Sequence, residues 1–165
     1  MSPAAARPPT PFRAALPRLV RASLLTGVID GLFACVLSVA FYHSTVERLF
    51  QGIASTLLGP EAFSGGTRTA AVGLLMHFGV AFTWSAVFLF AVTRSPRLRG
   101  VLATPYGRLK TASVYGPAVW LVMSLVVIPL LLHRPPRIGG LWLVELLGHI
   151  PFVGLPIVAS IAEPA

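Results

Sequence analysis

Few residues of this chain carry charge, and only one is a cysteine. Cys35 is the single thiol among 165 residues, which excludes an internal disulfide and a metal site built from several cysteines. Charged residues make up 11% of the sequence, whereas a soluble domain has about 25%. Hydrophobic residues make up 55%, and the mean hydropathy is +0.80. This composition excludes a disordered chain, argues against a soluble enzyme and indicates an integral membrane protein.

Sequence motifs of catalysis are also absent. The chain has no His-Glu-x-x-His zinc helix, no Gly-x-Ser-x-Gly nucleophile turn and no phosphate-binding loop. Glu145 and His149 have the wrong spacing for the Glu-x-x-His motif of di-metal helices. We therefore predict no enzyme activity, no catalytic residue and no metal site. The basic residues lie beside apolar segments rather than in a run with aromatics, so we expect no nucleic acid partner.

Four segments are long and apolar enough to cross a bilayer, which requires about 20 residues in a helix. Within lipid each segment must be helical, because an unpaired backbone group there costs several kcal/mol. The sequence therefore predicts an all-α membrane protein, a bundle of four transmembrane helices surrounded by the lipid bilayer. The predicted spans are 22–42, 70–92, 112–132 and 141–162.

The basic residues predict the orientation of these spans. Nine of them flank one side of the membrane and four flank the other. Because cytoplasmic loops carry the excess of Lys and Arg, both termini are expected in the cytoplasm. The nine are Arg7, Arg13, Arg18, Arg21, Arg94, Arg97, Arg99, Arg108 and Lys110, and the four are Arg48, Arg68, Arg134 and Arg137.

The N-terminal residues 1–18 are rich in Pro, Ala and Arg. A segment of this composition buries too little apolar surface to form a packed core. We predict an extended cytoplasmic tail over 1–18, followed by the four-helix transmembrane domain over 19–165.

A further helix is predicted between the first two spans. Apolar residues recur there at helical spacing over about 45–58. Ser44-x-x-Glu47 matches a capping box at its start, and Gly59-Pro60 marks its end. We expect a short amphipathic helix that either lies in the outer membrane interface or packs on top of the bundle.

Four titratable residues lie within the predicted spans, where such residues are rare and usually face the bundle interior. They are Asp30, His77, Glu145 and His149. The helical rise places Asp30, His77 and His149 within about 6 Å of the middle of their spans. Glu145 lies one turn from His149 on the same helix face. We predict an intramembrane polar cluster contributed by three helices.

Small residues accompany the polar ones along two spans. They are Ser23, Gly27 and Gly31 in the first span, and Gly73 and Ala81 in the second. Small residues at such spacings let two helix backbones approach closely. We therefore predict these five as helix-packing positions.

The polar cluster has three interpretations. Hydrogen bonds between the spans would fix their register and do nothing else. Asp30 and the two histidines would alternatively form a proton-linked site, with prolines of the last two spans supplying the kinks of a transporter. Two histidines at matched depth would also suit a haem or chlorin, with His77 or His149 as the axial ligand. The residues indicate no other cofactor.

Several stretches resemble an uncharacterised family of small four-helix bacterial inner-membrane proteins that is remotely similar to YagU-type proteins. The resemblance implies a four-helix fold in the bacterial inner membrane and no established chemistry. A link to acid tolerance is implied for the remote YagU-type relatives alone. Ser124 stands where the family pattern leads us to expect Asn. The stretches are DGLFA at 30–34, QGIAS at 51–55, LLGP at 57–60, LVMS at 121–124 with Pro129, and VGLPI at 153–157.

The function expected from the sequence follows from these features. The small size, the small-residue helix faces and the lack of a catalytic motif favour a non-catalytic accessory or scaffold subunit of a larger membrane assembly, for example a respiratory or photosynthetic one. Its partner would be another membrane protein or a second copy of this chain. The alternative is a proton-linked small transporter or channel that uses Asp30, His77 and His149.

Overall fold

The computed structural model describes residues 11–162, and side chains from residue 15 onward. Every regular element in this range is a helix. Four continuous helical segments are long and apolar enough to cross a membrane, which confirms the predicted all-α architecture of a multi-pass membrane protein. They are Ala15–Phe41, Gly66–Arg94, Gly107–Leu132 and Gly140–Ala162.

Each membrane-spanning segment is built from one to three helical elements. The first joins α1 to the π-helical turn η1, the second is α3, and the third and fourth each contain a π turn between two α-helices. In chain order the elements are α1 (Pro11–Val36), η1 (Leu37–Phe41), α3 (Gly66–Arg94), α5 (Gly107–Val122), η3 (Met123–Val127), α6 (Ile128–Leu132), α7 (Gly140–His149), η4 (Ile150–Gly154) and α8 (Leu155–Ala162).

The predicted start of the first helix is wrong. Residues 11–18 were expected to be extended, but α1 begins at Pro11 and includes Pro17. Proline at the start of a helix loses no hydrogen bond, and the alanines and leucine between the two prolines favour helix. Residues 1–10 of the predicted tail lie outside the described residues.

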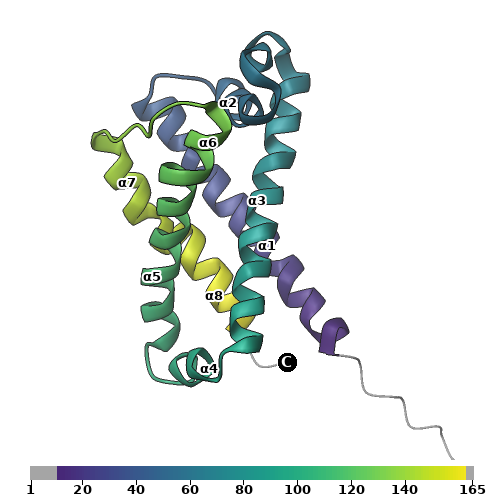
Figure 1. The fold of residues 1–165 in the computed structure, drawn as a ribbon, viewed down its shortest axis with the longest axis vertical. Coiled ribbons are helices and arrows are strands. Elements are labelled where there is room, and N and C mark those ends of the chain that lie inside the picture. The colour runs from purple at the N-terminus through teal and green to yellow at the C-terminus, as the bar shows by residue number, and fades with distance from the viewer. Residues whose placement is uncertain (1–10, 163–165) are drawn as a thin grey trace, which may run out of the picture.

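The four spans pack around a core at one end of the bundle. In Figure 1, α4 (Pro96–Leu102) and the last turn of α8 lie at the lower end, whereas α2 (Val46–Leu58) lies at the upper end. The buried apolar residues come from α1, α3, α5, η4 and α8, and Leu98 and Leu102 of α4 pack against them. The core residues are Ala22, Phe88, Ala112, Val119, Val153, Ile157, Val158 and Ile161.

Helix α2 packs against the upper end of α3. Its buried residues include Phe50 and Ala54, and a Cβ added at Gly73 of α3 would overlap the carbonyl of Phe50. The structure therefore has α2 docked on the bundle. Thr45, rather than Ser44, caps α2, because Thr45 is the last residue with extended backbone and its Oγ1 accepts from the Arg48 amide at 3.1 Å.

Two glycines let α5 cross the fourth span in backbone contact. A Cβ at Gly116 would overlap the carbonyl of His149, and a Cβ at Gly154 would overlap the carbonyl of Ala112. Gly154 belongs to the π turn η4, which also contains Pro151. Proline lacks an N–H and clashes with the carbonyl four residues earlier, and helices with such defects often kink.

Candidate functional site

The predicted helix-packing residues lie buried at two interfaces. Ser23, Gly27 and Gly31 form the side of α1 that faces α3, where Phe78 covers Gly27 and His77 covers Gly31. Ala81 is also buried, whereas Gly73 contacts α2 instead of another span. Because Gly27 and Gly31 have no side chain, the imidazole of His77 on α3 can lie directly on the backbone of α1.

His77 is fixed by a backbone carbonyl of the neighbouring span. Its Nε2 lies 2.9 Å from the carbonyl oxygen of Gly27. A carbonyl only accepts, so Nε2 donates and the neutral ring has its lone pair on Nδ1. A Cβ at Gly31 would come within 3.2 Å of Nε2. The α1 glycines therefore provide both the acceptor and the space for this ring.

His149 is held within its own helix and covered by an aromatic ring. Its Nδ1 donates to the carbonyl oxygen of Glu145 at 2.7 Å, which leaves Nε2 as the nitrogen that can take a proton. The ring centroid lies 4.8 Å from that of Trp120 on α5. His149 is 9% exposed. It ends α7 directly before the π turn η4.

Glu145 forms a hydrogen bond with a residue just beyond the first span. The Tyr42 hydroxyl donates to Oε1 of Glu145 at 3.1 Å. Partial burial of its ring, and then the Glu145 carboxylate, raise the pKa of the Tyr42 phenol to about 12. The phenol therefore keeps its proton at neutral pH and remains a donor. This bond joins the upper ends of the first and fourth spans.

Asp30 is the residue that interacts electrostatically with each of the other three. It is half-buried on α1, next to Gly31. Its carboxyl interacts electrostatically with His149 and His77, and its charge also acts on Glu145. No hydrogen bond joins Asp30 to either imidazole within the described chain, so the four groups form a loose electrostatic cluster. Asp30, His77, Glu145 and His149 together form the intramembrane polar cluster.

The sequence did not indicate Tyr42 and Trp120 as neighbours of the cluster. Tyr42 directly follows the first span and Glu145 lies near the start of the fourth, so their matched depth on antiparallel helices was a usable signal. No such signal existed for Trp120, whose contact with His149 depends on the Gly116 crossing. The Trp120 Nε1 is buried without a hydrogen-bond partner among the described residues.

The other two tryptophans, Trp84 and Trp142, take part in hydrogen bonds between spans. The Trp142 Nε1 donates to Ser124 Oγ at 3.2 Å, so the serine at this position of the third span serves as an acceptor. Tyr115 donates to the Trp84 carbonyl at 2.6 Å and joins α5 to α3. These bonds link neighbouring spans outside the polar cluster.

Among the described residues, no group of three or more His, Cys, Asp or Glu side chains is arranged to hold a metal ion. Haem or chlorin ligation by His77 or His149 stays a prediction, since one axial histidine is enough for such a group.

Comparisons with protein-family models, curated proteins and solved structures give no match to this chain.

Proposed function

We propose that this protein is a non-catalytic accessory or scaffold subunit that binds a helix of a larger membrane assembly through the outer face of α3. The proposal places it in a bacterial inner membrane with both termini in the cytoplasm. Its partner is another membrane protein or a second copy of the chain.

The observation that carries this proposal is the position of Gly79. Apart from the glycines that begin a span, seven glycines lie within the spans, and added Cβ atoms at six of them would meet other atoms within 4 Å. Gly79 is exposed, and a Cβ there would meet nothing within 4 Å. Glycine weakens a helix by about 0.5–1 kcal/mol relative to alanine. In the other six cases close packing offsets this loss, and a docked helix would offset it at Gly79.

The surroundings of Gly79 suit a helix partner. Leu75 and Thr83 lie one turn to either side on the same face of α3, and both are exposed. The Thr83 hydroxyl donates to the Gly79 carbonyl at 2.8 Å and so lies flat against its own helix. A small residue between two such neighbours forms a shallow depression that another helix can approach closely.

Photo-crosslinking tests this docking face. A photoreactive amino acid at Leu75 is expected to crosslink to a membrane protein in intact cells, whereas one at Val114 of α5 is expected to give none. The two positions are matched, because Leu75 is 74% exposed and Val114 is 71% exposed. Gly79→Leu should remove the Leu75 crosslink, because the larger side chain fills the contact.

Gly52→Leu is the control for this substitution. Gly52 of α2 also has open space around its Cβ position, but it lies outside the spans. The Leu75 crosslink should persist in this variant. A protein that purifies from mild detergent as a solitary monomer, and shows equal or no crosslinking at the two positions, would contradict the proposal.

A proton-linked transporter or channel is the second candidate, and the position of Asp30 favours it. A half-buried carboxyl on α1 interacts with imidazoles on α3 and α7, so three spans contribute titratable groups that act on one another. Each imidazole has one nitrogen committed to a backbone carbonyl. The other nitrogen of each ring can take up or release a proton.

A further inference from the structure

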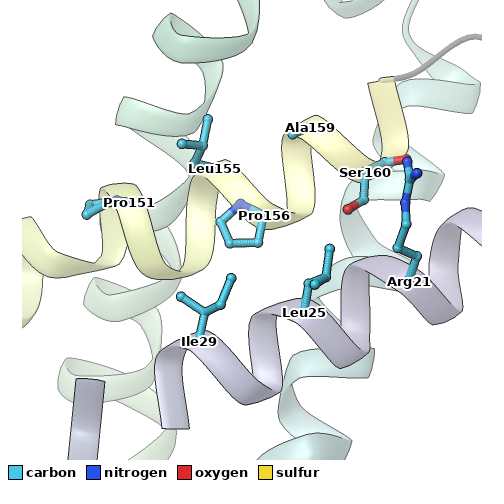
Figure 2. Close-up of a pocket in the computed structure, with 8 residues that line it drawn as sticks. All are labelled: Arg21, Leu25, Ile29, Pro151, Leu155, Pro156, Ala159 and Ser160. Atoms are coloured by element: carbon cyan, nitrogen blue, oxygen red, sulfur yellow. The ribbon is translucent and has the colours of Figure 1, made fainter. Parts of the chain in front are cut away.

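A groove runs between the first and last helices of the bundle. It has a volume of about 320 Å³ and is lined mainly by apolar side chains. In Figure 2, Leu25 and Ile29 of α1 face Pro156 of α8, and Leu155 and Ala159 of α8 also line the groove. All five residues lie within the membrane-spanning segments. The groove therefore opens at a depth where acyl chains surround the protein.

The shape of α8 explains the groove. Pro156 stands in the first turn of α8 directly after the π turn η4, where the loss of a backbone N–H is tolerated. Pro156 is buried. Ala159, one turn nearer the end of the helix, is too small to fill the space beside α1. Pro156 and Ala159 therefore both line the groove.

One end of the groove carries positive charge. Arg21 of α1 lines the groove, and its Nη2 donates to the Ser160 carbonyl at 3.0 Å, as Figure 2 shows. Arg108 of α5 donates to the Ala162 carbonyl at 3.4 Å. Arg18 is half-buried one turn before Arg21. Two cationic side chains, Arg21 and Arg108, thus contact carbonyls in the last turn of the last span.

We propose that this groove binds an anionic phospholipid, with one acyl chain along Leu25, Ile29 and Pro156 and the phosphate at Arg21. An apolar channel that ends at an arginine matches an amphiphile with a negative head. The planar guanidinium can contact a phosphate oxygen and a carbonyl together, because its donors point in different directions. Basic sites between spans bind acidic lipid head groups in this way.

Native mass spectrometry of the full chain in detergent tests the proposal. Phosphatidylglycerol is expected to bind about tenfold more tightly than phosphatidylcholine with the same acyl chains, because the cationic end distinguishes their net charge. Arg21→Gln should remove this preference. Arg18→Gln should keep it, since Arg18 does not line the groove. If both variants lost the preference for phosphatidylglycerol equally, the lipid would be attracted to surface charge in general, and the proposal would be overturned.

A second pair of variants tests the groove without touching the arginine. Ala159→Leu should fill the channel and lower phosphatidylglycerol binding about tenfold, whereas Ala118→Leu on the exposed side of α5 should leave it unchanged. Inorganic phosphate at millimolar concentration should not compete. Undiminished lipid binding by Ala159→Leu, or displacement of the lipid by phosphate, would overturn the proposal. Circular dichroism and elution volume confirm that each variant is folded.

Discussion

Leucine in place of Gly116 is expected to prevent the third and fourth spans from assembling. Any side chain here must displace backbone, because a Cβ would overlap the His149 carbonyl and approach the Gly154 amide to 3.1 Å. Overpacking against backbone of this kind should cost about 3 kcal/mol or more. The crossing also holds Trp120 against His149, so the variant should lose that contact. Unfolding in mixed micelles, followed by tryptophan fluorescence, measures the loss.

Gly79→Ala is the control for the Gly116 prediction. The open space at Gly79 accepts a methyl group without contact. The free energy of unfolding of the purified monomer should therefore be higher than that of wild type by up to about 1 kcal/mol, because alanine is the better helix former. If Gly116→Leu unfolded at the same denaturant fraction as wild type, the close crossing of the two spans would be wrong.

Asparagine in place of Asp30 is expected to reduce proton flux through the protein to the rate of empty vesicles. Asparagine has nearly the same shape but cannot bind or release a proton. The groups that face Asp30 are His77 on α3 and both Glu145 and His149 on α7. Proteoliposomes with an internal pH-sensitive dye and an imposed pH gradient measure the flux. Wild-type protein should dissipate the gradient faster than vesicles without protein.

Glu61→Gln provides the matched carboxylate control for the Asp30 prediction. Glu61 is exposed in the 3-10 turn η2 (Gly59–Ser64), outside the spans. Its replacement should leave the flux unchanged. If Asp30→Asn conducted protons as wild type does, Asp30 would have no part in transport. If wild-type protein conducted no better than empty vesicles, the accessory-subunit function would stand alone.

The spans were predictable because their physical cause is local. Apolar runs of sufficient length must form helices in lipid, so hydropathy located all four segments. The Gly59-Pro60 pair is also a local signal, and it located the end of α2. The error over residues 11–18 is local as well. Proline was interpreted as a marker of extended chain, although Pro11 at the helix start disturbs no hydrogen bond.

The contacts of the polar residues were not predictable in the same way. Which carbonyl accepts from His77 depends on how α1 and α3 are aligned and rotated, and hydropathy does not specify either. The sequence indicated that Gly27 and Gly31 pack closely, and the structure adds that His77 is the group packed on them. At a spacing of four residues, Gly154 has no second small residue that would mark it as a packing position, and Gly116 has only Ala112.

The lipid groove was unpredictable for a related reason. Arg21 and Ser160 are separated by 139 residues, and only the packing of α1 against α8 brings them together. Each residue by itself is ordinary at the end of a span. Their juxtaposition beside Pro156 depends on the position of the π turn, which the sequence suggested only as a possible kink at proline.

Cysteine labelling in intact cells tests most directly the claim that this chain crosses a membrane four times. In a Cys35→Ser background, Ser64→Cys and His133→Cys place single thiols at the exposed upper end of the bundle, and Ala103→Cys places one after α4 at the lower end. A membrane-impermeant maleimide should label the first two in intact cells and the third only after the membrane is permeabilised. Equal labelling of all three in intact cells would contradict the four-span account.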